Sequence, residues 1–296
     1  MARKLHRRRL LSRTEIARQS MLHRWMWKLR IALYEESSIF LSHYINEDKI
    51  MLGVIGAMDE EIRLLHAELE GVKEFVHAET TVYCGSYKGT EIALAQSGIG
   101  KVNATICTQM LIDLFKPKKL IFSGVAGGLL PNMLAGDMIV ASHVVQYDMD
   151  LTAFGRRHGE TPGRDRLIEC DPDLVAKATT AFDSAFENTE AGPNLMLGTV
   201  ASGDRFVQDT NMLRWLQREF AALATEMEGA AFGYTCKING LPFAVIRALS
   251  DSSSQSASSD FEANLHQACR HSFQLMDHLI PTALQENKRI DRRARD

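Results

Sequence analysis

The chain has 296 residues, of which 45% are hydrophobic and 24% charged, with 20 glycines and only seven prolines, which is the composition of a soluble globular protein. The formal net charge of −3 is unevenly spread: residues 1–30 hold ten Lys or Arg against the single acid Glu15, which leaves −12 for the remainder. A mildly acidic body argues against a nucleic-acid-binding surface in the main domain, and the lack of any run of 18 apolar residues argues against an integral membrane segment.

The five cysteines are dispersed along the chain, without a C-x-x-C pair or the spacing of a metal finger. Such a set indicates buried free thiols in a reducing compartment. We therefore expect a cytoplasmic protein with no metal site and no cofactor.

Residues 1–49 differ in composition from the rest and are expected to form a basic N-terminal extension, disordered or loosely helical. An Arg-rich, acid-poor start is typical of an organelle transit peptide or of an amphipathic helix on an anionic membrane, so organelle targeting stays open. Alternatively, the extension is sequence upstream of a true start at Met51. Residues 50–286 are expected to form one α/β domain, followed by a charged tail over residues 287–296.

The domain opens with a short apolar run at residues 49–55, which predicts a buried strand. Residues 58–69 follow with a helical pattern and three acids in the first turn, where acids compensate the helix dipole. The third acid, Glu61, is a candidate site residue because the turn at Gly56-Ala57 would hold this helix start against the carboxyl edge of the sheet.

A β-hairpin and a helix are expected next. Residues 81–87 and 91–97 are joined by Lys88-Gly89-Thr90, which predicts the hairpin. The helix opens at Gly98-Ile99-Gly100-Lys101 and ends at Lys116-Pro117. Its apolar positions, which recur every four residues, are Val102, Ile106, Met110 and Leu114.

A buried strand at residues 120–122 leads into Ser123-Gly124-Val125-Ala126-Gly127-Gly128, which predicts a glycine-rich turn. The evidence for a phosphate-binding loop is weak, because the segment lacks the G-x-x-x-x-G-K spacing of such loops and contains no Lys. Closely spaced glycines let the backbone approach a ligand, here a sugar or a nucleobase. Ala126 and Gly127 are therefore candidate binding residues.

The middle of the chain continues the alternation of strands and helices. Residues 147–163 are polar and predict a functional loop or an interface arm. A helix with Pro172 in its first turn is expected to reach about Phe186, followed by a strand at residues 195–202 and a helix at 210–220. Phe206, just past that strand, is either a core aromatic or a platform on which a base stacks.

The segment Glu226-Met227-Glu228 precedes three small residues and predicts the junction between a strand and a helix that reaches residue 238. Two carboxylates two positions apart on a helix point in different directions, so both can line a pocket only where strand becomes helix. A strand over residues 241–249 then ends in Ser250-Asp251, which gives Glu226, Glu228 and Asp251 a way to converge at the carboxyl ends of strands, where ligands bind. The alternative is a helix start enriched in acid for its dipole.

A capping box at Ser259-x-x-Glu262 is expected to start the last helix, which reaches about Leu284. The order of elements predicts an α/β protein, a doubly wound three-layer α/β/α sandwich with a central mixed sheet.

Seven motifs, in order along residues 51–284, resemble those of the 5′-methylthioadenosine/S-adenosylhomocysteine nucleosidases. They are Ile55-Gly56-Ala57-Met58-Asp59-Glu60-Glu61, Ser97-Gly98-Ile99-Gly100-Lys101, Gly124-Val125-Ala126-Gly127-Gly128, Asp150-Leu151-Thr152-Ala153-Phe154-Gly155, Ser202-Gly203-Asp204-Arg205-Phe206, Glu226-Met227-Glu228 and Arg247-Ala248-Leu249-Ser250-Asp251. The resemblance implies a nucleoside phosphorylase-like fold and a homodimer. It does not extend to the basic extension.

The resemblance also implies roles for single residues. Glu61 would activate the attacking water, Glu228 would bind the ribose hydroxyls, and Asp251 would protonate the leaving adenine. Phe206 would lie against the adenine, with the backbone of Val207 at the edge of the base.

Further positions of the expected binding site are Met227 under the ribose and Phe261, which is similar to the aromatic residue that reaches the 5′-substituent pocket of a neighbouring subunit. Glu226, Ser250, Ala126 and Gly127 complete the substrate-binding set. The sequence departs from the family at two positions: Val125 stands where some members have Ser, and Arg205 replaces a small residue.

The chemistry of N-glycosidic cleavage fits these residues. The reaction passes through an oxocarbenium-like ribose, so it needs an acid for the departing base, a base or anion on the water side, and carboxylate contacts to ribose hydroxyls. Three carboxylates from three strand ends supply that set. For Asp251 to donate a proton near neutral pH, burial and the nearby acids must raise its pKa.

The sequence therefore predicts a hydrolase that releases adenine from 5′-methylthioadenosine and S-adenosylhomocysteine, in methionine salvage and methyl-cycle recycling. A purine-nucleoside phosphorylase of the same fold is an alternative, and it would require cationic phosphate ligands near the first helical turn. Hydrolysis of another 6-aminopurine nucleoside, such as aminofutalosine or 5′-deoxyadenosine, is also compatible with the sequence. A non-enzymatic nucleoside-binding module would not require an acid at Asp251.

Overall fold

The structure is a computed structural model that describes residues 50–189, 192–251 and 257–286. The chain divides into two units, residues 1–49 and 50–296, and everything described below belongs to the second unit. The expected basic extension and the expected charged tail at 287–296 lie outside the described residues.

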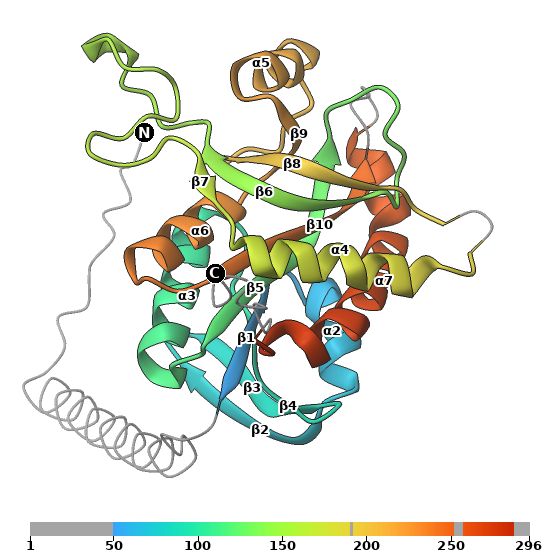
Figure 1. Ribbon diagram of the computed structural model, residues 1–296. Coiled ribbons are helices and arrows are strands. Elements are labelled where there is room, and N and C mark those ends of the chain that lie inside the picture. Colours follow the sequence, from blue (N-terminus) through green and yellow to red (C-terminus); the bar gives the residue numbers. More distant parts are fainter. Residues whose placement is uncertain (1–49, 190–191, 252–256, 287–296) are drawn as a thin grey trace, which may run out of the picture. The chain divides into compact units, whose positions relative to one another are not determined.

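Strands and helices alternate along the described chain (Figure 1). In order they are β1 (Met51–Gly56), α2 (Asp59–Ala67), β2 (Glu70–His77), β3 (Thr80–Tyr87), β4 (Thr90–Gln96), α3 (Lys101–Phe115), β5 (Lys119–Gly128), β6 (Met138–Gln146), the 3₁₀ turn η1 (Thr152–Phe154), β7 (Ile168–Glu169), α4 (Pro172–Phe186), β8 (Leu195–Ser202), α5 (Thr210–Phe220), β9 (Ala222–Glu226), α6 (Gly229–Ile238), β10 (Phe243–Asp251) and α7 (Ala257–Ala283).

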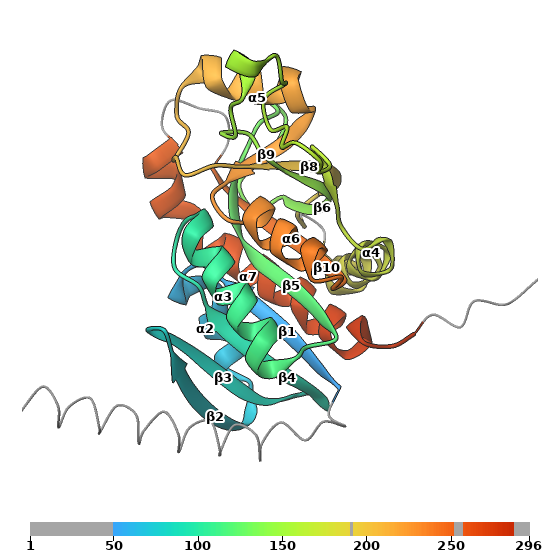
Figure 2. The same cartoon turned by 90° about the vertical axis from the view of Figure 1, so that its left-hand side faces the viewer.

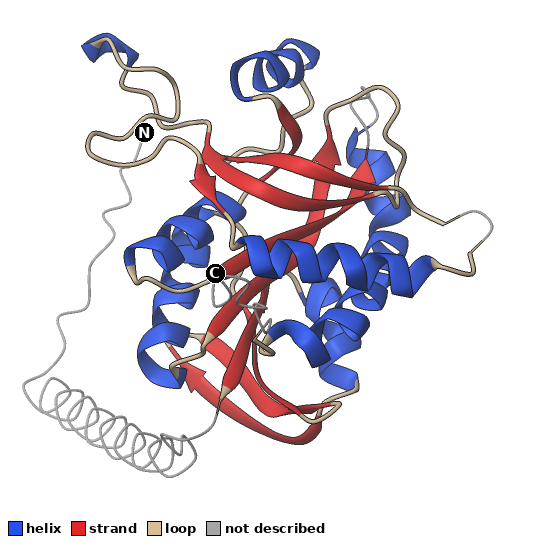
Figure 3. Cartoon of the chain, in the orientation of Figure 1, coloured by secondary structure: helices blue, strands red, loops and turns tan. Residues whose placement is uncertain are grey.

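In the described part of the chain, ten strands form one mixed sheet, drawn in red in Figure 3. On one side of the sheet, β1 pairs in parallel with β4 and β5, and β4 continues through β3 to β2 as antiparallel neighbours. On the other side, β5 pairs with both β9 and β10, while β10 pairs with β6, β6 with β8, and β8 with β9. These last five strands form a closed circuit of pairs, so this part of the sheet has no open edge between them.

Helices cover both faces of the sheet. In Figure 1, α3 and α6 lie to the left of β5 and β10, whereas α2 and α7 lie to the right; Figure 2 looks at the layer of α3 and α6. Helix α4 packs along α7. The prediction of an α/β/α sandwich with a central mixed sheet is confirmed. None of the described helices combines the length and the apolarity needed to cross a membrane.

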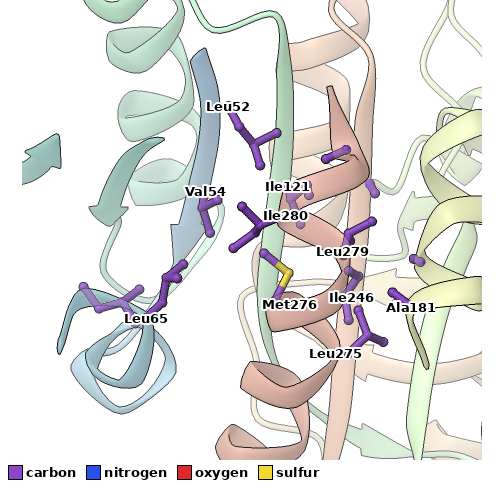
Figure 4. Packing of buried hydrophobic residues seen from close by; sticks show 14 of the residues in the cluster. Leu52, Val54, Leu65, Ile121, Ala181, Ile246, Leu275, Met276, Leu279 and Ile280 are labelled. Carbon is purple, nitrogen blue, oxygen red and sulfur yellow. The ribbon is translucent and has the colours of Figure 1, made fainter. Parts of the chain in front are cut away.

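The main core lies between the sheet and α7 (Figure 4). The members that are at most 3% exposed include Leu52, Val54, Ile121, Ile246, Met276, Leu279 and Ile280. Since helices cover both faces of β1, β5 and β10, the apolar runs of these strands are nearly continuous rather than alternating. Full burial of each Leu or Ile side chain contributes roughly 2 kcal/mol.

The glycine-rich segment does not form a turn, and this prediction is wrong. β5 continues through Ser123 to Gly128, because it pairs with β10 along most of its length and with β9 at its end. Gly124, Gly127 and Gly128 are not among the glycines with positive φ, so they serve a purpose other than turning the chain.

Several element boundaries also differ from the predictions. Helix α7 begins at Ala257, before the expected capping box at Ser259-x-x-Glu262, so that box does not start the helix. Helix α6 begins at Gly229, which confirms Glu226-Met227-Glu228 as a strand-to-helix junction.

The apolar stripe predicted for α3 is only partly buried. Val102 and Ile106 are 68% and 49% exposed, whereas Met110 is 7% exposed. The helix turns a different face to the core, formed by Ala104, Cys107, Thr108, Leu111 and Phe115. All five cysteines of the chain are free and buried, as predicted.

Candidate active site

All eleven candidate residues line one pocket, together with Ala57, Met58, Ile99, Val125, Arg205 and Thr225. The lining comes from the ends of β5, β9 and β10, from the segments that follow β1, β4, β8 and β9, and from the helices α2 and α7, which supply Glu61 and Phe261. The pocket therefore lies at the carboxyl ends of strands, as the sequence predicts. Among the described residues, no group of three or more His, Cys, Asp or Glu could hold a metal ion.

Glu61 is fixed at the start of α2 by three backbone N–H groups. Its Oε2 accepts from Ala57 N at 2.6 Å and from Met58 N at 3.0 Å, and its Oε1 accepts from Val125 N at 2.8 Å. Burial raises the pKa of Glu61, while the charge of Arg247 and the three N–H groups lower it; the net shift is upward. The result is a rigidly oriented carboxylate that takes up a proton more readily than an ordinary Glu.

Asp251 ends β10 and is only 5% exposed. The hydroxyl of Ser250 donates to its Oδ1 at 2.8 Å, which holds the carboxyl group in one orientation. Asp251 also pairs with Gly127 on the neighbouring β5.

Two glycines of β5 provide the space that these carboxyl groups occupy. A Cβ on Gly124 would lie 2.5 Å from Glu61 Oε1, and one on Gly127 would lie 2.9 Å from Asp251 Oδ2. Any larger residue would push the carboxyl groups away from the strand. The glycine-rich segment thus lets side chains approach the backbone, which is a different use from the predicted turn.

Glu228 lies between β9 and α6 and is 6% exposed. Within the described residues it accepts one hydrogen bond, from Gly100 N to Oε1 at 2.7 Å, so the other oxygen keeps its acceptor capacity. Burial and then the charge of Glu226 raise the pKa of Glu228 to about 8, against the opposing charge of Arg247.

Glu226 lines the same pocket, but its oxygens already have partners. Its Oε1 accepts from Ser202 Oγ, and its Oε2 accepts from Glu228 N at 3.1 Å and from Gly229 N at 2.8 Å. Oε2 also pairs with the guanidinium of Arg247, whose side chain is 1% exposed. Glu226 is thus built to hold the strand-to-helix junction that carries Glu228.

Sequence reasoning assigned no role to Arg247, although a signal was present. A single Arg within the otherwise apolar strand β10 requires a buried partner, because an unpaired charge in a core is very unfavourable. Besides Glu226, its Nη1 donates to Phe122 O at 3.3 Å and to Ile246 O at 3.1 Å, and its guanidinium lies 4.7 Å from the centroid of the Phe122 ring.

An aromatic pair lines the pocket near these acids. Phe206 is 45% exposed, so it is not the core aromatic that was the alternative prediction. Its ring meets that of Phe261 edge to face, with centroids 5.9 Å apart. Val207 is buried in a smaller core cluster, which fixes the loop that presents Phe206, and Met227 is half-buried in the lining.

The model of the phosphorylase superfamily matches residues 51–281 of this chain. The chain is 38% identical over 224 residues to the 5′-methylthioadenosine/S-adenosylhomocysteine nucleosidase of Geobacillus kaustophilus, which covers 75% of this chain and 93% of that protein. It is equally identical, over 226 residues, to the Bacillus subtilis protein of the same name, with 76% and 96% covered.

Solved structures are similar to this chain as well. A nucleosidase of this name from Colwellia psychrerythraea, in complex with adenine, is similar with a TM-score of 0.74 and 34% identity over 79% of this chain and 96% of that one. The native futalosine hydrolase of Helicobacter pylori is similar with a TM-score of 0.74 and 33% identity over 81% and 99% of the two chains.

Proposed function

Because the chain belongs to the 5′-methylthioadenosine/S-adenosylhomocysteine nucleosidases of the phosphorylase superfamily, we propose that it hydrolyses the N-glycosidic bond of these two nucleosides and releases adenine. The observation that carries the proposal is the convergence on one pocket of Glu61 from the start of α2, Glu228 from the residues after β9 and Asp251 from the end of β10. This is the set of groups that glycosidic cleavage requires.

At the base end of the pocket, Asp251 is the general acid. Its proton passes to the purine as the glycosidic bond breaks, and the hydroxyl of Ser250 keeps the carboxyl group oriented. The exposed ring of Phe206 offers a stacking surface for the adenine, and the backbone of Val207 lies next to it at the edge of the base. Ala126 and Gly127 let the β5 backbone approach the purine closely.

At the ribose, Glu228 accepts from the hydroxyls while Gly100 N holds its Oε1. Met227 packs under the sugar. Positive charge develops on the ribose in the transition state, and it favours the ionised form of Glu228, whose pKa burial and the charge of Glu226 raise to about 8 in the free protein. Glu226 contributes indirectly, through the backbone N–H of Glu228.

On the water side, Glu61 is the general base. Its orientation is set by three N–H donors, and its raised pKa brings its proton affinity closer to neutral pH, where a general base is most effective. It takes a proton from the water that attacks the anomeric carbon.

Hydrolysis is favoured over phosphorolysis by the charges around this face. A phosphorylase must bind a dianion, which calls for Arg or Lys beside the ribose. Here three acids, Asp59, Glu60 and Glu61, form the first turn of α2, and Val125 provides no donor side chain. Three acids in that turn would repel phosphate.

The test is to incubate the protein with 5′-methylthioadenosine and with S-adenosylhomocysteine in phosphate-free buffer and to measure free adenine and the sugar product. We expect 5′-methylthioribose from the first substrate, at the same rate in millimolar phosphate. Glu61→Gln should bind substrate without turnover, while Glu60→Gln in the same helical turn should stay active. A ribose 1-phosphate product, or a rate proportional to phosphate, would replace this proposal by a phosphorylase.

A second substrate class deserves the same assay. The similarity to the futalosine hydrolase of Helicobacter pylori favours testing aminofutalosine, together with 5′-deoxyadenosine. A purely nucleoside-binding role is disfavoured because binding alone does not require a buried acid at Asp251.

We also propose that the protein acts as a homodimer in the cytoplasm, without nucleic acid as a partner and without an integral membrane segment. Val102 and Ile106, which are 68% and 49% exposed, lie four positions apart on α3, and Ile99, which is 54% exposed, lies two residues before the helix begins, so the three form an apolar stripe at the start of α3. Since Ile99 also lines the pocket, a partner that covers this stripe would lie next to the substrate. The free cysteines suit a reducing compartment.

A further inference from the structure

Among the described residues that line the pocket, Arg205 is the only Lys, Arg or His. Its side chain is exposed. We propose that Arg205 selects substrates whose 5′ substituent ends in a carboxylate, so that S-adenosylhomocysteine is preferred over 5′-methylthioadenosine. This inference rests on the proposed function and adds a specificity determinant to it.

The backbone next to Arg205 is anchored on the ribose side of the pocket. Asp204 Oδ1 accepts from Lys101 N at 2.8 Å, which fixes residue 204 against the start of α3. Gly100, the residue before Lys101, donates its backbone N–H to Glu228, the proposed ribose ligand. Residue 205 therefore follows a segment that is tethered to the same helix start that holds the proposed ribose ligand, and Arg205 and Ile99 both line the pocket there.

The acids at and next to residue 204 have other partners. Asp148 pairs with Lys101 Nζ at 2.6 Å, and its Oδ2 accepts from Asp204 N at 3.1 Å. Within the described ranges, Arg205 has no ion pair of its own. Its guanidinium is therefore available to a ligand rather than committed to neutralising a neighbouring acid.

A carboxylate on the ligand needs a partner in the pocket. Four acids line the pocket, Glu61, Glu226, Glu228 and Asp251, and among the described lining residues Arg205 is the cation that can bind a carboxylate. A guanidinium binds a carboxylate through two parallel N–H···O bonds. The methylthio group has no charge and forms no ion pair with Arg205, whereas the homocysteinyl group ends in a zwitterionic amino acid whose carboxylate can pair with the guanidinium.

The test compares kcat/KM for S-adenosylhomocysteine, 5′-methylthioadenosine and the longer, uncharged 5′-butylthioadenosine. In Arg205→Gln, the ratio of S-adenosylhomocysteine to 5′-methylthioadenosine should fall about threefold to tenfold, because a partly exposed ion pair contributes modestly. Arg205→Lys should give an intermediate ratio, because it keeps the positive charge and loses the two parallel N–H donors of the guanidinium. Arg214→Gln, on the exposed side of α5, should leave the ratio unchanged.

Added NaCl should lower the wild-type ratio and have little effect on the ratio of Arg205→Gln. A ratio in Arg205→Gln within twofold of wild type would overturn the inference. So would an equal loss with 5′-butylthioadenosine, which would mean that Arg205 contacts the alkyl chain.

If the wild type releases no adenine from any of these nucleosides, the proposed function has failed. The same ligands then bind without being consumed. Dissociation constants measured by calorimetry for wild type and Arg205→Gln then test whether Arg205 binds the carboxylate. Equal affinity ratios in the two proteins overturn the inference, and a reduced preference for the carboxylate ligand in Arg205→Gln supports it.

Discussion

Asp251 is the residue on which departure of the base depends in the proposed reaction. Replacing it by Asn keeps the shape of the side chain and removes the transferable proton, so kcat for adenine release should fall roughly 100-fold or more. Steady-state assays with 5′-methylthioadenosine measure this. Asp183→Asn, at an exposed position of α4, should turn over like wild type. A kcat of Asp251→Asn close to that of wild type would show that Asp251 is not the general acid.

Glu228 makes a pH-dependent contribution to stability. Its pKa of about 8 in the folded state lies above the ordinary value of 4.5, so the folded protein holds a proton that the unfolded chain releases. The contribution of Glu228 to the free energy of unfolding must therefore fall as pH rises from about 4.5 to about 8. Thermal unfolding at pH 5, 6.5 and 8 should show a shallower decline in Glu228→Gln than in wild type. Parallel curves for the two proteins would contradict the raised pKa.

The position of some site residues could be predicted from the sequence, and that of others could not. Glu61, Glu228 and Asp251 could be predicted because each follows a recognisable strand, and strand ends meet at one edge of a sheet. The ion pair of Arg247 with Glu226 could not, because it joins two strands, β10 and β9, whose proximity depends on the whole topology. For the same reason, the sequence suggested that Glu226 binds substrate, whereas its oxygens are occupied by protein donors.

At the scale of elements, the junction between β9 and α6 depends on a buried ion pair. Glu226→Gln leaves the guanidinium of Arg247 buried without its counter-charge, and breaking such a pair costs about 3–5 kcal/mol. Urea unfolding should show a loss of that order. The double replacement Glu226→Gln/Arg247→Met should lose less than the sum of the two single ones, because it leaves no unpaired charge. Strict additivity would show that the two residues stabilise the junction independently.

The elements that the sequence revealed are those with a strong local pattern. The hairpin of β3 and β4, the helix α4 with Pro172 in its first turn, and the strand β8 agree closely with expectation. The strand β2 was missed because it is an edge strand whose side chains are mostly exposed and often charged, so its apolar residues mark no buried face. The face of α3 was misjudged because Ala104, Cys107 and Thr108 are small and give a weak apolar signal.

At the scale of the whole molecule, the closed circuit of β5, β10, β6, β8 and β9 brings the strand ends of the pocket together. Sequence reasoning predicts a mixed sheet but not this closure. β10 pairs with β5 in parallel and with β6 in antiparallel fashion, and neither pairing is encoded by local periodicity. Continuous apolar runs such as that of β10 show that a strand is buried, not which neighbours it has.

The division of the chain leads to a prediction about its first 49 residues. Every residue of the proposed site lies between Glu61 and Phe261, in the second unit. Deletion of residues 1–49 should therefore leave the melting temperature and the rate of adenine release nearly unchanged. Calorimetry and the adenine assay measure both. Loss of folded, active protein would mean that the extension stabilises the domain, and residues 50–286 would not be an independent unit.

The apolar stripe of α3 gives the last prediction, which concerns assembly. Val102 is 68% exposed beside Ile99 and Ile106, and a carboxylate there would be buried without a partner in a dimer that covers the stripe. Val102→Glu should therefore shift the protein from dimer to monomer in size-exclusion chromatography with light scattering. Because Ile99 lines the pocket, activity should fall with dilution of this variant. Val76→Glu on β2, at a position also 68% exposed, is the matched control and should leave the assembly intact. If Val102→Glu remains dimeric and fully active, the stripe is not the interface between subunits.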